Sequence, residues 1–186
     1  MKVILMRHGE TDSNRDGIWM GRELDVSINE TGKTQLEQTI SRIKPLNPEV
    51  IIASPLRRTR DSAEVLGNTF GIPVELDDRL IEVGVGSLSG KTRVEAAKLM
   101  SLSLEEVMRQ YRIGQYDYTS VGGESAKHIF DRSKDFLNDL SKRKEKCAII
   151  MTHGGIVRSL HELITGDLSF AYEGIPNASV LVLEYV

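Results

Sequence analysis

The residues Lys2-Val-Ile-Leu-Met-Arg-His-Gly-Glu-Thr11 give the first strong indication of the fold and of the chemistry. The apolar run Val3–Met6 predicts a strand that is buried on both faces, as in a parallel sheet with helices on both sides. Arg7, His8 and Gly9 follow at the carboxyl end of this strand. Because α/β sheets bind ligands outside the carboxyl ends of their strands, we expect the guanidinium and the imidazole to face a ligand.

Two later apolar runs end in residues of the same kind. The run Val50–Ala53 leads to Arg58, and the run Cys147–Met151 leads to His153 and Gly154. If these strands lie beside the first one, two histidines and two arginines meet at one edge of the sheet. Glycines at such an edge let backbone N–H groups approach a ligand, and helix N-termini favour anions. The sequence therefore predicts an anion site.

The remaining apolar residues complete an alternation of strands and helices. Further strands are expected at 73–76 and 179–186, and helical spacing covers 29–43, 56–70, 125–140 and 155–165. Ser54-Pro55 predicts an N-cap with proline at the first helical position, and Ser125 predicts the cap of a helix that turns Phe130 inward. The alternation predicts a three-layer α/β/α sandwich with a mainly parallel central sheet, in one domain over residues 1–186.

The segment 84–123 interrupts this alternation. It opens with a glycine-rich loop, continues with a helical pattern over 93–110, and ends among Tyr111, Tyr116 and Tyr118. We interpret it as a small insertion that folds over the sheet edge and the active site, not as a second domain. The three tyrosines are equally compatible with packing and with a binding surface.

Composition limits the function classes. The chain has 186 residues, with 24 Lys and Arg against 27 Asp and Glu, which gives a net charge of −3. Binding to nucleic acid or to an anionic membrane is not expected, because both need a basic excess. The single cysteine, Cys147, excludes an intrachain disulfide. With no secretory signal and no run of ~20 apolar residues, we expect a soluble, cytoplasmic protein; nothing indicates its oligomeric state.

Two imidazoles with two guanidiniums suit the transfer of a phosphoryl group. Guanidinium groups match phosphate oxygens bidentately, and a neutral imidazole at His8 is a competent nucleophile at pH 7. A second, protonated imidazole at His153 would stabilise charge on the transferred group. The leaving alcohol needs a proton from a carboxylic acid, and Glu82, in the loop after the fourth strand, is well placed to give it.

An ordered set of motifs resembles those of the histidine phosphatase superfamily, the phosphoglycerate-mutase-like family. The resemblance covers nearly the whole chain and is carried by Arg7-His-Gly-Glu-Thr11, Asp25–Gly32 with Gln35, Ser54-Pro-Leu-Arg-Arg58 with Ser62-Ala63, Glu82-x-x-x-Gly86-x-x-x-Gly90, Gly122-Gly-Glu-Ser125 with Arg132, Thr152-His-Gly-Gly155 with Arg158, and Asn177-Ala-Ser-Val180. A lone Arg-His-Gly triplet would be weak evidence, whereas motifs in the family's order are specific.

The resemblance implies an enzyme that is phosphorylated on His8 during turnover. The other implied site residues either take part in catalysis or hold the phosphate group: Glu82 and His153 in catalysis, and Arg7, Arg58, Asn14, Gly154 and Asn177 in phosphate binding. The implied activity is that of a histidine acid-type phosphatase, a phosphoric monoester hydrolase. Its expected partner is a small phosphorylated substrate, and no metal or other cofactor is expected.

Other interpretations use the same residues differently. A phosphoglycerate mutase would share the catalytic core, but closure against water looks incomplete in 186 residues, which favours hydrolysis. A binding module for phosphorylated ligands would have no use for the acid Glu82. A zinc site would need H-E-x-x-H spacing or a cysteine pair. A P-loop ending in Gly90-Lys-Thr92 would need glycine at position 85, where the chain has Val85.

Overall fold

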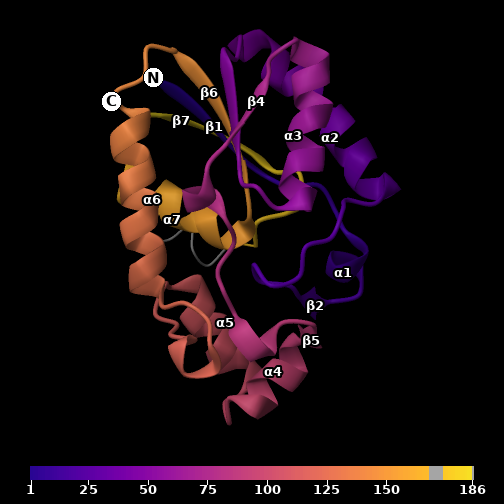
Figure 1. The fold of residues 1–186 in the computed structure, drawn as a ribbon, viewed down its shortest axis with the longest axis vertical. Helices are drawn as coiled ribbons and strands as arrows, with labels where there is room; N and C mark the ends of the chain where they lie inside the picture. The colour runs from indigo at the N-terminus through magenta and orange to yellow at the C-terminus, as the bar shows by residue number, and fades with distance from the viewer. Residues whose placement is uncertain (168–173, 186) are drawn as a thin grey trace.

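The computed structural model describes residues 1–167 and 174–185, and it shows a five-stranded central sheet (Figure 1). The strand order is β4-β3-β6-β1-β7, with bounds β1 Lys2–Arg7, β3 Val50–Ala53, β4 Val74–Leu76, β6 Cys147–Thr152 and β7 Val180–Glu184. Neighbouring strands are parallel except β7, which pairs antiparallel with β1. The mainly parallel sheet is confirmed; Val186, at the end of the last predicted strand, lies outside the described residues.

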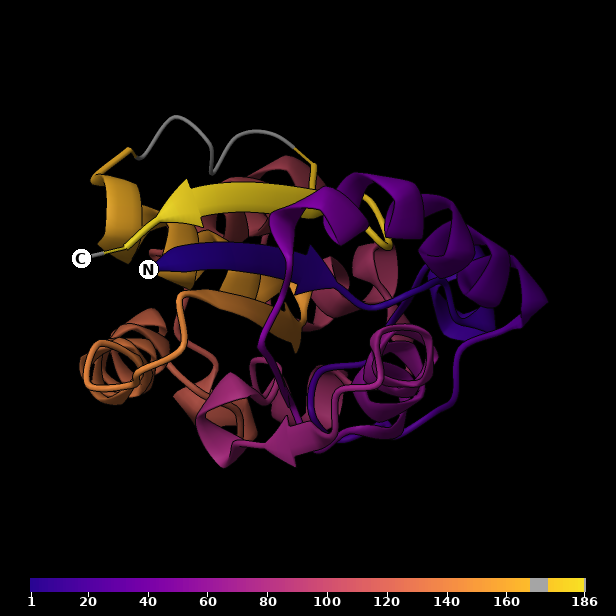
Figure 2. The same ribbon diagram turned by 90° about the horizontal axis from the view of Figure 1, so that it is seen from above.

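Two hydrophobic cores lie on the two faces of the sheet, because successive side chains of a strand point to opposite faces. In β1, Val3 and Leu5 belong to one core, while Ile4 and Met6 belong to the other. Two helices cover each face (Figures 1 and 2): α2 Glu30–Ile43 and α3 Arg57–Phe70 on one, and α6 Ala126–Leu140 and α7 Gly154–Thr165 on the other. The predicted three-layer sandwich is therefore confirmed.

Residues 86–121, called the cap below, lie beyond the carboxyl ends of the parallel strands (Figure 1). The cap contains β5 Lys91–Thr92, α4 Arg93–Leu99, α5 Leu104–Arg112 and 3-10 turns at Gly86–Leu88 and Thr119–Val121. Strand β5 pairs with β2, Ile18–Trp19, which ties the cap to the segment after β1. That segment also contains α1, Asp12–Arg15. Elsewhere in the chain, 3-10 turns lie at Lys44–Leu46, after α2, and at Asp78–Leu80, after β4.

The helix predicted over 93–110 is wrong as a single element. Helix α4 ends at Leu99, and α5 begins at Leu104. Ser103 causes the new start, since its Oγ accepts the N–H of Glu106 at 3.1 Å and so caps a second helix. The break lets the cap fold back on itself over the sheet edge.

Aromatic rings hold the cap against β2, in the segment after β1. The rings of Tyr116 and Tyr118 are buried and stacked with centroids 5.0 Å apart, and Trp19 meets Tyr118 edge-on at 5.4 Å. Trp19 also meets Tyr111 edge-on at 6.0 Å. These contacts place Tyr118 in the packing of the cap, while Tyr111 and Tyr116 also line a cavity.

The start of α3 differs from the prediction. The helix begins at Arg57, whose N–H donates to Oδ1 of Asp25 at 2.7 Å, so a carboxylate from another segment replaces the expected cap. Ser54 instead accepts a hydrogen bond from His153 at 2.8 Å. The predicted N-cap is wrong because this serine is used inside the site.

Helix α6 is capped as predicted but packs by a different stripe. The Oγ of Ser125 accepts the N–H of His128 at 3.3 Å, which confirms the cap. Phe130, expected to point inward, is 38% exposed. The buried stripe runs through Ile129 and Ser133 to the end of the helix, and Phe130 lies one position, about 100° of rotation, away from Ile129.

The two ends of the described chain lie together. Tyr185 N–H donates to the carbonyl of Met1 at 2.8 Å, and the amino group of Met1 donates to the carbonyl of Tyr185. Figure 1 shows both ends at the opposite end of the molecule from the cap. The carboxyl ends of the parallel strands are thus far from both termini.

Candidate active site

The register of the sheet brings the predicted residues together. Arg7 lies opposite Thr152 in the parallel pair of β1 and β6, and His8 N–H donates to the Thr152 carbonyl at 3.0 Å. His153 follows Thr152, and its ring lies 5.3 Å from that of His8, centroid to centroid, at an angle of 62°. Strand β3 pairs with the other side of β6 and leads to Arg58 in α3. Four side chains from three strand ends therefore meet.

Close backbone contacts fix the loop after β1. The N–H of Gly9 donates to Oγ of Ser62 in α3 at 3.0 Å. A Cβ at position 9 would lie 2.6 Å from the carbonyl oxygen of Gly32 in α2, so no side chain fits there. The backbone that carries His8 is thus held between two helices.

His8 is a neutral imidazole with one free electron pair. It is 2% exposed, and its Nδ1 lies 2.7 Å from the carbonyl oxygen of Gly9. Because a carbonyl can only accept, Nδ1 carries the proton and Nε2 does not. Burial, followed by the charges of Arg7 and Arg58, lowers the pKa of His8 well below 6.5. At pH 7 the Nε2 atom is therefore available as a nucleophile.

His153 is held between Arg58 and Ser54. Arg58 Nε–H donates to Nδ1 of His153 at 3.2 Å, so the ring proton lies on Nε2 and donates to Ser54 Oγ at 2.8 Å. Burial, followed by the charge of Arg58, lowers the pKa of His153 well below 6.5. The expectation of a protonated His153 is wrong in this structure, because a second proton on Nδ1 would point at the guanidinium.

The two predicted arginines are anchored and keep donors for an anion. Arg58 is 1% exposed and donates to the carbonyls of Leu24 at 2.9 Å and Gly21 at 2.8 Å. With the bond to the imidazole, this uses three of about five N–H donors of a guanidinium. Burial lowers the pKa of Arg58 to about 10, so the group is charged at pH 7. Arg7 Nη1 donates to the carbonyl of Ile175 at 2.5 Å.

Gly154 and Asn14 line the same cavity, and Asn177 holds Asn14 and the backbone of His8. Gly154 opens α7, whose N-cap residue makes no side-chain cap bond, so the first N–H groups of this helix remain for an anion. Asn177 Nδ2 donates to the carbonyl of His8 at 3.1 Å and to Oδ1 of Asn14 at 3.0 Å. The structure thus gives Asn177 a supporting place instead of the predicted phosphate contact, and leaves the Asn14 amide as donor.

Glu82 lies in the cavity against the first turn of α7. It is half-buried, and its Oε1 accepts the N–H of Val83 at 2.9 Å. A Cβ built at Gly155 would lie 2.7 Å from this Oε1 and 3.0 Å from the hydroxyl oxygen of Tyr111. A methyl group at position 155 would therefore displace the carboxylate of Glu82.

Two more carboxylates hold the loop that carries Glu82. Glu124 Oε2 accepts the N–H of Gly84 at 2.7 Å. Glu23 accepts the N–H groups of the two following residues at 3.2 and 2.8 Å. Three consecutive backbone donors of this loop are therefore bound to side chains, which restricts where Glu82 can lie.

The cavity has a volume of about 270 Å³ and is lined by three arginines that the sequence did not assign to the site. Arg93 and Arg112 come from the cap, and Arg158 comes from α7, where its guanidinium lies 5.1 Å over the ring of Tyr111. Arg158 follows Gly154 by one helical turn, and this spacing could have indicated it. Arg93 and Arg112 had no such signal, because only the folding of the cap brings them here.

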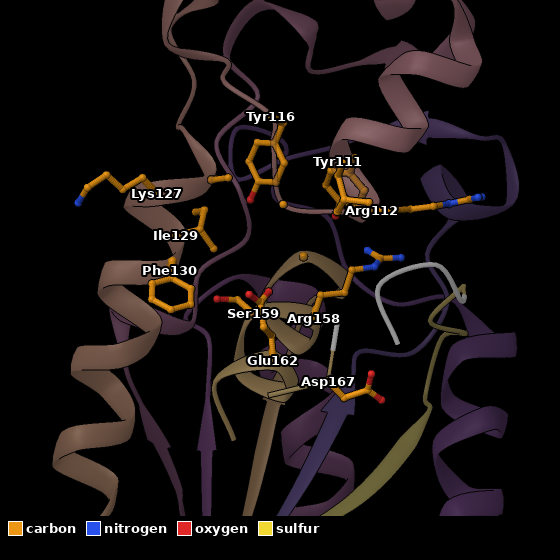
Figure 3. Close-up of a pocket in the computed structure, with 14 residues that line it drawn as sticks. Tyr111, Arg112, Tyr116, Lys127, Ile129, Phe130, Arg158, Ser159, Glu162 and Asp167 are labelled. Carbon is orange, nitrogen blue, oxygen red and sulfur yellow. The ribbon is translucent and has the colours of Figure 1, made fainter. Parts of the chain in front are cut away.

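Figure 3 shows the residues that line a second cavity, which has a volume of about 300 Å³. Tyr111, Arg112 and Arg158 line both cavities, so these three side chains form the wall between them. The second cavity extends between α6 and α7, where Ile129 and Phe130 line it.

In residues 1–167 and 174–185, no group of three or more His, Cys, Asp or Glu side chains is placed to hold a metal ion. Over the same ranges, no helix has the length and apolar character needed to cross a membrane. The other two histidines, His128 and His161, lie in α6 and α7 and do not line the catalytic cavity.

Comparisons with known proteins find similar phosphatases and a phosphoglycerate mutase-like protein. A metal-independent phosphoserine phosphatase of Arabidopsis thaliana is 33% identical over 187 residues, covering 98% of this chain and 75% of the relative. A phosphoglycerate mutase-like protein of the same plant is 30% identical over 165 residues, covering 87% and 70%. The solved structure of a mycobacterial glucosyl-3-phosphoglycerate phosphatase complexed with VO3 has a TM-score of 0.84 at 26% identity, covering 98% of this chain and 92% of that one.

The family model for branch 1 of the histidine phosphatase superfamily matches residues 3–186. Apart from Lys2, the first residue of β1, this match spans the strands and helices of the sandwich and the cap, together with the residues gathered in the cavity. The chain therefore belongs to the histidine phosphatase superfamily, branch 1.

Proposed function

We propose that this protein is a phosphatase that hydrolyses small phosphomonoesters through a phosphohistidine on Nε2 of His8. The observation that carries the proposal is the state of His8, a buried neutral imidazole whose Nδ1–H is fixed on the carbonyl of Gly9. His8 lines a cavity with Arg7 and Arg58. A phosphate group bound by these guanidiniums is held beside the nucleophile, which replaces an encounter in solution by a positioned reaction.

The reaction has two balanced steps. In the first, Nε2 of His8 bonds to phosphorus as the ester P–O bond breaks, and Glu82 gives its proton to the departing alkoxide. The Gly9 carbonyl stabilises the positive charge that the ring gains through its Nδ1–H. In the second, water attacks phosphorus, Glu82 takes a proton from that water, and the P–N bond breaks. One ester and one water give one alcohol and one phosphate.

The other site residues hold these reactants. Arg7 and Arg58 bind phosphate oxygens with their remaining donors, and the start of α7 at Gly154 with the Asn14 amide adds further hydrogen bonds. His153 is a positioning residue, because it accepts the Nε–H of Arg58 and so fixes the plane of the guanidinium.

The pKa of His8 supports assignment as a histidine acid-type phosphatase. Burial, with Arg7 and Arg58, lowers this pKa well below 6.5, so Nε2 keeps its electron pair at pH values just below 6.5. An ordinary solvated histidine would already be half protonated there. The enzyme is therefore expected to remain active in mildly acid solution.

A phosphoglycerate mutase is the second candidate, favoured by the similarity to the mutase-like protein of Arabidopsis thaliana. It would form the same phosphohistidine and return the phosphoryl group to a bound phosphorylated acid instead of to water. A panel of phosphorylated metabolites, scored for free phosphate and for isomerised product in one assay, distinguishes the two activities.

Trapping of the intermediate tests the proposed function. Brief reaction with a radioactively labelled phosphomonoester, stopped in alkali, should leave label on the protein that is stable to alkali and labile to acid. His8→Ala should abolish the label and the turnover while leaving the circular dichroism spectrum unchanged. Lys33→Gln, an exposed residue of α2 that pairs with Glu30, is the control and should keep both. Full activity in His8→Ala would overturn the mechanism.

A further inference from the structure

The cavity that contains His8 has one hydroxyl group close to the acid. Among the described residues that line it, Tyr111 alone carries a hydroxyl and Glu82 alone carries a carboxylate. A Cβ at Gly155 would lie 2.7 Å from Oε1 of Glu82 and 3.0 Å from the hydroxyl oxygen of Tyr111. No more than about 5.7 Å, the sum of these two distances, therefore separates the two oxygens. One water molecule bridges a gap of this size with two hydrogen bonds of ordinary length.

Packing holds the Tyr111 hydroxyl in this place. The Tyr111 ring meets Trp19 edge-on at 6.0 Å and lies 5.6 Å from the ring of Tyr116, centroid to centroid. The guanidinium of Arg158 lies over its face, 5.1 Å from the ring centre (Figure 3). Because the ring is contacted by two other rings and by a guanidinium, it has little freedom to turn its hydroxyl away. The group is therefore positioned before a substrate binds.

The Tyr111 hydroxyl keeps its proton at neutral pH. Burial, followed by the charge of Glu82, raises the pKa of Tyr111 to about 12, although the neighbouring arginines oppose this shift. A neutral phenolic hydroxyl both donates and accepts hydrogen bonds. Tyr111 is therefore an acceptor that adds no charge to the cavity and takes up no proton from a reacting group.

The second step of the proposed reaction needs a water molecule with a defined orientation. In-line attack on the phosphohistidine brings this water to the place that the alcohol has left, on the side of Glu82. The water oxygen must present an electron pair to phosphorus, so both of its hydrogens must point away, toward acceptors. Glu82 accepts one of them. The guanidiniums of the cavity only donate hydrogen bonds, whereas the Tyr111 oxygen is able to accept the second.

We propose that Tyr111 is a catalytic residue of the dephosphorylation step, in which it orients the attacking water together with Glu82. The bond from the water oxygen to phosphorus forms as the P–N bond breaks, and the electron pair of that bond returns to Nε2 of His8. One proton of the water passes to the Glu82 carboxylate, and Tyr111 retains its own proton throughout. The inference rests on the proposed phosphatase function and names a residue that favours water as the acceptor of the phosphoryl group.

The decay of the phosphoenzyme tests this role directly. Brief reaction with radioactively labelled p-nitrophenyl phosphate, followed by an excess of unlabelled substrate, measures the rate at which label leaves the protein. Tyr111→Phe keeps the ring and removes the hydroxyl, and the decay should become about tenfold slower, as for the loss of one hydrogen bond. The rate at which label appears should change much less, because no water reacts in that step.

Tyr118→Phe is the matched control. In the described part of the chain, the buried hydroxyl of Tyr118 has no hydrogen-bond partner, and this residue does not line the catalytic cavity. Removal of this hydroxyl makes the same chemical change in the same aromatic cluster. The rates at which label appears and decays should both remain those of the unmodified protein.

A second nucleophile separates the orientation of water from a general disturbance of Glu82. Glycerol, added during turnover, accepts the phosphoryl group through a hydroxyl that has a carbon atom where water has its second hydrogen. This hydroxyl uses Glu82 but has no hydrogen left for the Tyr111 oxygen. Tyr111→Phe should therefore raise the ratio of glycerol phosphate to free phosphate about tenfold at a fixed glycerol concentration. A merely structural role would slow both acceptors and leave the ratio unchanged.

The outcomes distinguish this inference from the proposed function. Label that decays from Tyr111→Phe at the rate of the unmodified protein, or slower decay with an unchanged product ratio, would overturn the role of Tyr111 and leave the phosphatase proposal standing. Absence of label on the unmodified protein would reject the phosphohistidine mechanism and the role of Tyr111 with it.

Discussion

The carboxylate of Glu124 accepts the backbone N–H of Gly84 at 2.7 Å, although the two residues are 40 positions apart in the chain. Gly84 follows Glu82 by two residues. Glu124 is 6% exposed and also pairs with Arg22 at 2.6 Å and Arg132 at 3.5 Å. Arg132 in turn donates to the carbonyl of Glu82 at 3.3 Å. One buried charge thus fixes the loop of the acid from both sides.

Replacement of Glu124 by glutamine should therefore lower the free energy of unfolding. Glu124→Gln keeps the shape but leaves Arg132 buried without its counter-charge, and we expect a loss of ~3 kcal/mol in the free energy of unfolding. Glu64→Gln, on the exposed side of α3, is the control and should change it by less than about 0.5 kcal/mol. Urea unfolding of the two variants and of the unmodified protein measures these differences in the free energy of unfolding. Unfolding of Glu124→Gln at the urea midpoint of the unmodified protein would contradict the network.

The two adjacent glycines of α7 should respond differently to alanine. A Cβ at Gly155 would lie 2.7 Å from Oε1 of Glu82, whereas a Cβ at Gly154 would have its nearest neighbour at 3.9 Å. Gly155→Ala should displace the carboxylate and lower kcat for alkyl phosphates by about 10- to 100-fold, a part of what a positioned acid supplies. Gly154→Ala keeps the backbone N–H and should be affected much less. Similar kcat values in the two variants would show that Glu82 does not depend on this contact.

The role of Glu82 as proton donor predicts a dependence on the leaving group. Glu82→Gln keeps the shape of the side chain and removes the transferable proton. For alkyl phosphates the rate of phosphoenzyme formation should fall on the order of 10²–10⁴-fold, the usual contribution of a positioned acid. For p-nitrophenyl phosphate, whose phenolate leaves unaided, the loss should be much smaller. Rapid-quench measurement of both rates decides, and an equal loss on both substrates would make Glu82 a substrate-positioning residue.

The two buried imidazoles make the free energy of unfolding depend on pH. Burial lowers the pKa values of His8 and His153 well below 6.5, so below pH 6.5 the unfolded chain binds protons that the folded protein does not. Stability is fully present above pH 6.5 and falls as the pH falls below it, by up to about 1.4 kcal/mol per pH unit for each histidine. His8→Asn should remove the contribution of one histidine, up to about 1.4 kcal/mol per pH unit, from this slope. Urea unfolding between pH 7.5 and 5 tests it, and identical slopes would contradict the burial of a neutral imidazole.

The strands with continuous apolar runs, and the polar residues that follow them, were predictable from the sequence. The continuous apolar runs at Val3–Met6, Val50–Ala53 and Cys147–Met151 can be buried on both faces only in a sheet covered by helices, so the sandwich followed from them. The polar residues that follow these runs had to meet at one edge. This is why the sequence alone groups Arg7, His8, Arg58 and His153.

Features that depend on the path of the cap could not be predicted in this way. Arg93 and Arg112 reach the cavity only because the chain breaks between α4 and α5 and folds back. The neutral state of His153 depends on its burial and on the charge and hydrogen bond of Arg58, 95 residues away, which no local pattern encodes. Ser54 looked like a helix cap from its neighbours, whereas its tertiary contact with that histidine decided its place.

The pairing of Met1 with Tyr185, at the end of the molecule away from the cap, has a practical meaning for handling this enzyme. A fluorescent protein, an affinity tag or a surface linker attached at either terminus would leave the mouth of the cavity facing the solution. Because β1 and β7 are antiparallel neighbours, a short peptide could also bridge the two ends, and new termini opened in an exposed loop would give a circularly permuted enzyme with the same sheet.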